Sequence, residues 1–152
     1  MTFKLPVSVL VVIYTADLEV LLLERAARPG FWQSVTGSLD RSEEPLEVAA
    51  AREVMEETGI DAASGHLERW NVANTFEIYG QWRHRFAPGV THNTEHVFGL
   101  ALPAPVAARL APEEHVAFAW LPWREAAAKC FSWSNRDAIQ LLAERSLAGE
   151  GR

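Results

Sequence analysis

Residues 7–14 read VSVLVVIY, a run that is apolar except at Ser8 and is rich in β-branched side chains. A strand with no polar face has to be buried on both sides, so this run predicts a sheet covered by a layer on each face. It is much shorter than the roughly 20 apolar residues of a membrane-spanning helix. Because TADLEVLLLER follows it, where a signal peptide would have a small-residue cleavage site, we expect neither a signal peptide nor a membrane anchor.

Strand-like and helix-like patterns alternate along the rest of the chain. The expected strands are residues 7–14, 19–25, 32–36, 66–74, 76–82, 95–102 and 115–121. The expected helices are residues 45–58, 124–130 and 134–145, and a loop is expected at 87–94. The order of strands, helix, strands, helix predicts an α/β (α+β) sandwich, in which helices pack on a mixed sheet.

Composition limits the class of protein. With 152 residues, of which 49% are hydrophobic, we expect one domain over residues 1–152, with a frayed tail from about residue 147. The net charge of -6 argues against a broad nucleic-acid-binding surface. The lone Cys130 cannot form an internal disulfide, which favours a reducing compartment and a cytoplasmic protein. Nothing in the composition indicates an oligomeric state.

Residues 52–60 read REVMEETGI and close the helix expected at 45–58, which Pro45 begins and Gly59 ends. Glu53, Glu56 and Glu57 have i, i+3 and i+4 spacing, so they share one helix face and repel one another by some tenths of a kcal/mol per pair. The last two also lie at the negative end of the helix dipole. Such a face is either a solvated acidic surface or a set of carboxylates with a function.

Apolar residues on both sides of this helix favour the second reading. Two arcs of the helix are apolar, one formed by Leu46, Ala49 and Ala50 and the other by Val48, Ala51, Val54 and Met55. A helix of this kind is expected to pack between two layers, with its carboxylates facing a cleft. A hard divalent cation would offset their repulsion, and Mg²⁺, with Mn²⁺ as a substitute, prefers such oxygen ligands.

A spaced motif extends from Gly37 to the end of this helix. It consists of Gly37 and Glu44, then seven residues, then Arg52-Glu53-Val54, Glu56-Glu57 and Gly59-Ile60. This motif resembles the Nudix box. This box is the signature of hydrolases that cleave a diphosphate linked to another group. The resemblance implies the Nudix α/β/α sandwich. One departure is the interval SLDRSE between Gly37 and Glu44, which is one residue longer than usual and implies a longer loop before the helix.

The resemblance also implies roles for these residues. Glu53, Glu56 and Glu57 would be the metal ligands, the Gly37 carbonyl would add another, and Arg52 and Glu44 would orient this array. Glu114 in the segment PEEH is either a further acidic ligand or an ordinary loop charge. The candidates for the general base are Glu53 and Glu114.

Three stretches outside the box resemble the branch of the Nudix family that acts on a pterin triphosphate in folate synthesis. They read FWQSVTGS (31–38), RHRFAPGVTHNTEH (83–96) and SWSNRDAI (132–139). The implied partner is a small molecule, a pterin triphosphate or, as the alternative, a nucleoside triphosphate such as dATP or an oxidised deoxynucleotide. A reading from another class is a non-catalytic module that senses a nucleotide, although such modules are expected to lose box glutamates.

The candidate substrate-binding residues are Lys4, Arg25, Thr36, Phe76, Glu77, Ile78, Tyr79, Ser132 and Ser134. Lys4 and Arg25 either bind phosphate or are solvated strand ends. The carboxylate of Glu77 either reads the guanidine-like edge of a pterin or belongs to a plain half-buried strand. Ser134 either caps a helix or lines the pocket. In the RHR segment, strand alternation would send Arg83 and Arg85 to one face, for phosphate binding or for surface salt bridges.

Overall fold

The structure of the protein, a computed structural model, describes the backbone of residues 2–150 and the side chains of residues 2–146. Its strands form one mixed sheet with the order β3-β2-β1-β6-β5, in which β4 pairs with β1 and β7 pairs with β2. The strands are β1 (Val7–Thr15), β2 (Glu19–Arg25), β3 (Trp32–Gln33), β4 (Val35–Ser38), β5 (His66–Glu77), β6 (His92–Leu102) and β7 (His115–Pro122). β1 and β6 are parallel, whereas the other pairs are antiparallel.

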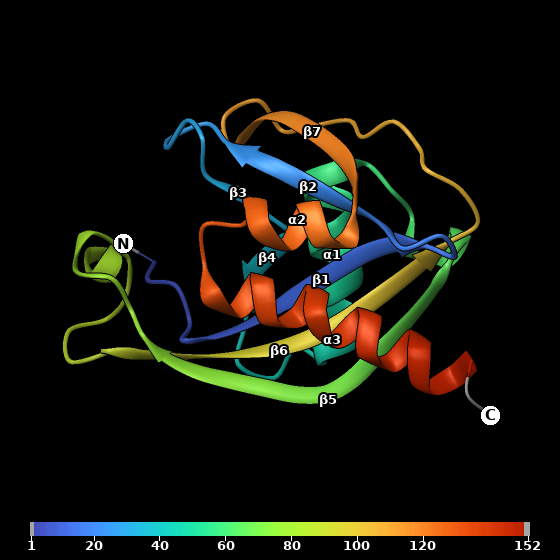
Figure 1. Cartoon of the computed structure of the whole chain (residues 1–152). Coiled ribbons are helices and arrows are strands. Elements are labelled where there is room, and N and C mark those ends of the chain that lie inside the picture. The colour runs from blue at the N-terminus through green and yellow to red at the C-terminus, as the bar shows by residue number, and fades with distance from the viewer. Residues whose placement is uncertain (1, 151–152) are drawn as a thin grey trace.

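Helices cover both faces of this sheet, as Figure 1 shows. α1 (Leu46–Thr58) lies on one face, and α2 (Trp123–Lys129) and α3 (Trp133–Glu150) lie on the other. Short 3-10 helices span Ala62–Ser64 and Gly80–Arg85. The predicted α/β/α sandwich with a mixed sheet is therefore confirmed.

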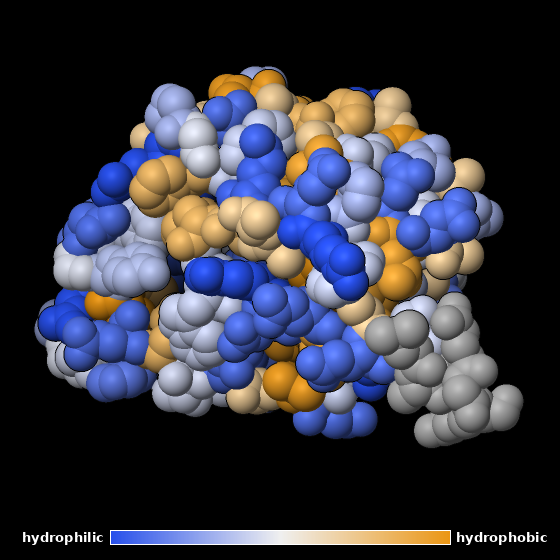
Figure 2. Space-filling model, in the orientation of Figure 1, coloured by the Kyte–Doolittle hydropathy of each residue, from blue (hydrophilic) through white to orange (hydrophobic). Residues whose placement is uncertain are grey.

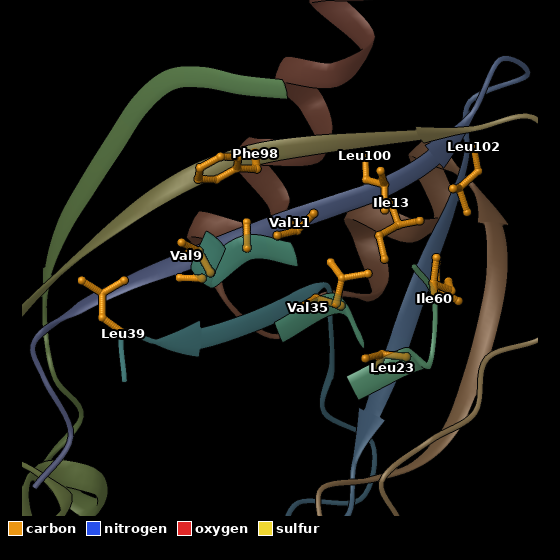
Figure 3. Packing of buried hydrophobic residues seen from close by; sticks show 14 residues of the cluster. Val9, Val11, Ile13, Leu23, Val35, Leu39, Ile60, Phe98, Leu100 and Leu102 are labelled. Carbon is orange, nitrogen blue, oxygen red and sulfur yellow. The ribbon is translucent and has the colours of Figure 1, made fainter. Parts of the chain in front are cut away.

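Strand β1 supplies both halves of the core because its side chains alternate between the two faces. Val9, Val11 and Ile13 pack with Phe98, Leu100 and other apolar residues on the α1 side, as seen in Figure 3. Its alternate residues, Leu10 and Val12, pack with residues of α2 and α3 on the opposite side. The run VSVLVVIY is thus buried on both faces, as its composition predicts.

The outer surface is mixed. In Figure 2, which shows the face with α2 and α3, hydrophobic residues lie in small groups among hydrophilic ones. Over the described part of the chain, every helix is too short or too polar to cross a membrane.

The structure corrects several expected boundaries. The strand expected at 32–36 is two strands, because the chain leaves β2 at Ser34 and pairs with β1 instead. The segments expected at 66–74 and 76–82 are one strand, β5, followed by the 3-10 helix Gly80–Arg85. β6 begins at His92, inside the expected loop 87–94.

Helix α1 ends as predicted and packs differently from the prediction. Gly59 adopts a left-handed conformation with φ 71°, and its N–H bonds to the Met55 carbonyl, whereas Pro45 precedes the helix as its N-cap. Val48 and Met55 are 50% and 46% exposed. The expectation of a helix packed between two layers is therefore wrong, because only the sheet side of α1 is covered and its other side faces solvent.

Helix α3 begins one residue earlier than predicted and extends further. Ser132 precedes it, and its Oγ accepts a hydrogen bond from the Asn135 N–H at 3.3 Å. The cap is therefore Ser132, and the capping alternative for Ser134 is wrong. The tail expected to fray from residue 147 is helical to Glu150, and residues 151–152 lie outside the described residues.

Candidate active site

The carboxylates of Glu53 and Glu57 lie where α1 packs against β4. The side chain of Glu53 is 12% exposed and that of Glu57 is 2% exposed. Gly37 lies directly under Glu53, so closely that a Cβ atom on Gly37 would collide with the Glu53 carboxyl group. The glycine is needed here for close approach, because any side chain would displace this carboxylate.

These two carboxyl groups are poorly solvated. Burial raises the pKa of Glu57 well above its ordinary range, and the neighbouring Glu53 and the charge of Glu114 raise it further. Burial also raises the pKa of Glu53. Glu57 Oε1 is buried without a hydrogen-bond partner, and the Thr36 N–H stabilises the charged form of Glu57. Two facing, desolvated carboxylates with an unsatisfied oxygen match the donor set of a hard divalent cation.

Glu56 differs from the other two predicted ligands. Its side chain is 55% exposed, and its Oε2 accepts a hydrogen bond from Arg52 Nη1 at 3.3 Å. Within the described side chains, no group of three or more His, Cys, Asp or Glu residues is arranged to hold one ion. The structure therefore brings Glu53, Glu57 and Gly37 together, and it leaves Glu56 at the solvent side of Arg52.

Arg52 connects the acidic site to the loop before α1. It donates from Nε and Nη2 to the two Glu44 carboxylate oxygens at 2.9 and 3.0 Å, from Nη2 to the Ser38 carbonyl at 3.1 Å, and from Nη1 to Glu53 at 2.8 Å. The Asp40 N–H donates to Glu44 at 2.8 Å. Hydrogen bonding from Arg52 lowers the pKa of Glu44 and holds it ionised. The longer loop between Gly37 and Glu44 therefore still places the Glu44 carboxylate against Arg52, so the expected pair is present in the structure.

Cationic side chains lie beside these carboxylates. Burial lowers the pKa of Lys4 and of Arg25, and for each the next cause is the nearby charge of Arg85. The charge of Glu53 raises the pKa of Lys4, and that of Glu57 raises the pKa of Arg25, so cations and carboxylates share one region. Arg25 also stacks on the Trp82 ring, 5.1 Å from its centroid, and its buried Nε has no partner among the described atoms.

Arg83 and Arg85 differ in their surroundings, because residues 80–85 form a 3-10 helix rather than a strand. Arg83 Nη2 pairs with Glu77 Oε1 at 3.2 Å on the surface. Arg85 lies near Lys4 and Arg25, and its carbonyl accepts a hydrogen bond from the Lys4 N–H at 2.8 Å. The expectation that both arginines share one face is therefore wrong.

Glu114 and His115 approach the site from the start of β7. Glu114 is exposed, its charge acts on Glu57, and its carbonyl accepts from the Ala26 N–H at 2.9 Å. His115 is buried with Nε2 3.8 Å from Glu57 Oε1, and burial lowers its pKa to about 4. Sequence reasoning missed His115, although it directly follows Glu114 in PEEH.

The remaining candidate substrate-binding residues lie at the end of β5 and at the start of α3. Phe76, at the end of β5, contacts the Trp133 ring edge-on with centroids 6.3 Å apart, and Ser132 and Ser134 flank this tryptophan. Glu77 is 68% exposed at its side chain. Ile78 is buried and Tyr79 is exposed, and both lie after the end of β5. The alternating strand expected over these residues therefore stops at Glu77.

Sequence reasoning also missed two buried polar residues of β6, Asn93 and Glu95. The segment HNTEHV that contains them has five polar residues in a row, so its sequence shows no alternation of polarity, although burial alternates along it in the structure. Asn93 lies in the expected loop 87–94 and Glu95 begins the expected strand 95–102, so nothing local in the sequence indicates that both are buried.

Residues 4–142 match the NUDIX domain family. Together with the sandwich fold and the carboxylate-bearing helix, this match shows that the chain belongs to the Nudix family of hydrolases, which in general depend on a divalent metal.

Its relatives give a narrower comparison. The chain is 49% identical over 141 residues to the dihydroneopterin triphosphate diphosphatase of Escherichia coli K12, covering 91% of this chain and 92% of the relative. It is 38% identical to the enzyme of the same name from Haemophilus influenzae, covering 92% and 89%. The solved structure of the E. coli dihydroneopterin triphosphate pyrophosphohydrolase superposes with a TM-score of 0.85 at 48% identity, covering 93% of this chain and 97% of that one.

Proposed function

We propose that the protein hydrolyses dihydroneopterin triphosphate to dihydroneopterin monophosphate and pyrophosphate, with Mg²⁺ or, as a substitute, Mn²⁺. The observation that carries this proposal is the identity of 49% to a dihydroneopterin triphosphate diphosphatase over 91% of the chain. Folate synthesis would be the setting, in the reducing cytoplasm that suits the buried free thiol of Cys130.

The site supports this chemistry through opposite charges in one region. Glu53 and Glu57, with the Gly37 carbonyl, would hold the metal, and Glu114 lies close enough to act on Glu57. A bound divalent ion would neutralise phosphate oxygens and make a water molecule more acidic. Lys4 and Arg25 would bind the phosphate chain beside it.

The reaction needs a base and a fixed orientation of the attacking water. Water attacks one of the two phosphorus atoms of the α–β bridge, the P–O bond between that phosphorus and the bridging oxygen breaks to give the monophosphate and pyrophosphate, and the water proton passes to a carboxylate. Glu53 and Glu114 are the candidates for this carboxylate. Arg52, which donates to both Glu44 and Glu53, would act as a positioning residue that holds the Glu53 carboxyl in place.

Steady-state kinetics test the substrate. Purified protein with Mg²⁺ is expected to cleave dihydroneopterin triphosphate with a higher kcat/KM than dATP or an oxidised deoxynucleotide, with pyrophosphate as a product. If dATP were cleaved equally well, the protein would be a nucleotide-pool enzyme. If no triphosphate were cleaved and a nucleotide still bound, it would be a sensor.

A pair of variants tests the metal site. Glu57→Gln is expected to abolish turnover, and it should also remove the rise in Tm that Mg²⁺ produces in the unchanged protein. Without metal the variant should be at least as stable, because it removes a buried carboxyl group that folding must either protonate or leave charged beside Glu53. Glu56→Gln keeps the buried pair and is expected to retain part of the Mg²⁺ response. An unaltered Mg²⁺ response in Glu57→Gln would contradict the metal assignment.

A further inference from the structure

A buried polar cluster lies on the face of the sheet that carries α2 and α3. It consists of Ser8 on β1, Asn93 and Glu95 on β6, and Ser134 in the first turn of α3, and each of the four is 4–7% exposed. Ser8 and Glu95 are neighbours across the parallel β1–β6 pair. Asn93 Nδ2 donates to Ser8 Oγ at 2.8 Å, and the Ser134 hydroxyl lies close enough to Glu95 to stabilise its charged form.

Two acceptors of this cluster have no partner. Glu95 Oε1 and Asn93 Oδ1 are buried and make no hydrogen bond within the described residues. None of the ion pairs among the described side chains includes Glu95. Burial raises the pKa of this carboxyl to about 7. An acceptor without a hydrogen bond is costly in a protein interior. Asn93 and Glu95 are two residues apart on β6, so their side chains lie on the same face, and their two free acceptors indicate a missing hydrogen-bond donor.

The cluster is connected to the metal-binding helix through β4. Asn135, next to Ser134, accepts a hydrogen bond at Oδ1 from the Ser34 N–H at 2.8 Å. Ser34 immediately precedes β4, the strand that carries Thr36 and Gly37 to Glu57 and Glu53. The polar cluster therefore lies on the other face of the sheet from the carboxylates of α1, and Asn135 links the start of α3 to the strand that contacts these carboxylates.

Aromatic rings lie beside the cluster. Phe76 is the β5 partner of Asn93, and its ring contacts Trp133, the residue before Ser134. Trp133 is 44% exposed although it is a large apolar side chain. Acceptors next to partly uncovered rings suit a flat heterocycle that carries donors along one edge.

We propose that Glu95 and Asn93 recognise the base of the substrate. They would accept hydrogen bonds from a ring N–H and the neighbouring exocyclic amino group of a 2-amino-4-oxopyrimidine ring, the edge that pterin and guanine share. Phe76 and Trp133 would lie against the ring. Adenine presents an acceptor in place of that ring N–H, so its binding would leave Glu95 unpaired.

This assignment rests on the proposed function, and it moves the base-reading role from Glu77 to Glu95. Glu77 is solvent-exposed and paired with Arg83, so it has little electrostatic advantage over water as an acceptor. Glu95 is buried. An unpaired acceptor is costly there, so Glu95 favours a ligand that supplies a hydrogen-bond donor over one that does not.

The test compares Glu95→Gln with the matched control Glu77→Gln on three substrates, dihydroneopterin triphosphate, dGTP and dATP. Glu95→Gln keeps the shape and replaces one acceptor by a donor. We expect its kcat/KM for dihydroneopterin triphosphate to fall by ~100-fold or more, mainly through KM, with dATP cleavage little changed. Glu77→Gln should leave the kinetics of all three substrates unchanged. Binding of dihydroneopterin without metal, followed by its fluorescence, should weaken in Glu95→Gln alone.

Several outcomes would overturn the assignment. One is an unchanged kcat/KM of Glu95→Gln for the pterin substrate, and another is an equal loss of kcat/KM for the pterin substrate and dATP.

If Glu95→Gln does not fold, the unchanged protein still tests the assignment. It should cleave dGTP at least tenfold better than dITP, which lacks the 2-amino group, and equal rates would refute the assignment. If the protein cleaved dGTP faster than the pterin substrate, and Glu95→Gln still lowered kcat/KM for dGTP, only the proposed substrate would be wrong. A preference for dATP would defeat both.

Discussion

Arg52 and Glu44 form a two-pronged ion pair, with Nε 2.9 Å from Oε2 and Nη2 3.0 Å from Oε1, and the same guanidinium reaches Glu53. Glu44 itself is nearly buried at the end of the loop before α1. The loop thereby controls where Arg52 holds the Glu53 carboxyl group. The pair links the start of the helix to its acidic end.

Removing the charge of Glu44 should therefore act on catalysis at a distance. Glu44→Gln is expected to lower kcat by ~10- to 100-fold with a smaller change in KM, because Arg52 loses the partner that orients it. The Tm should also fall by several degrees, since a buried pair is broken. Glu43→Gln, at the exposed neighbour that pairs with Arg41, is the control and should behave as the unchanged protein. A normal kcat in Glu44→Gln would show that the pair is only structural.

The contact between Gly37 and Glu53 makes a second prediction. Gly37→Ala places a methyl group where the Glu53 carboxyl lies, so that carboxyl has to move. A displacement of about 1 Å at a reacting centre costs ~100-fold in rate, and we expect kcat/KM to fall by that order with weaker Mg²⁺ activation. Gly80→Ala is the matched control, because no atom lies within 4 Å of its added Cβ. Equal activities of the two variants would contradict the close approach.

Much of the fold follows from local sequence signals. The apolar run of β1 requires two covering layers, and Pro45 and Gly59 frame α1, because each signal depends on backbone preferences or on burial within one segment. The pattern of box glutamates likewise indicates which helix carries the site. These features needed no knowledge of which strands pair.

The parts that the sequence did not reveal depend on tertiary packing. Glu53, Glu56 and Glu57 share one helical arc, yet only the sheet decides that Glu57 is buried and Glu56 is 55% exposed. Glu95 is hidden within a polar stretch, and its burial follows from the pairing of β6 with β1 and the cover of α3. Arg85 lies near Lys4 because the Lys4 N–H bonds to the Arg85 carbonyl, a contact between segments far apart in the sequence.

Arg85 should contribute to binding of the phosphate chain. Arg85→Ala is expected to raise KM for the triphosphate about tenfold, the effect of losing one charge-assisted contact. The increase should shrink at high salt, because the arginine is exposed. Arg83→Ala removes an equal charge from a surface pair with Glu77 and is expected to leave KM unchanged. If KM were the same in both variants, Arg85 would have no role in binding the phosphate chain.

The carboxyl group of Glu95 should make stability depend on pH. Its pKa is raised by burial from 4.5 to about 7, so between these values the folded protein binds more protons at this group than the unfolded chain does. The stabilisation that the protonated group provides is fully present below pH 4.5 and is lost as pH rises through about 7. By linkage, the total loss is about 3 kcal/mol.

Other groups titrate in the same range, so the comparison has to be between two proteins. His115, with its pKa lowered to about 4, has the opposite effect, because the unfolded chain binds the extra proton and stability rises with pH. The difference in unfolding free energy between the unchanged protein and Glu95→Gln cancels such common contributions. Measured by urea unfolding without metal from pH 4.5 to 8, the variant should gain stability relative to the unchanged protein as pH rises. A difference independent of pH would mean that Glu95 titrates as an ordinary, solvated carboxyl group.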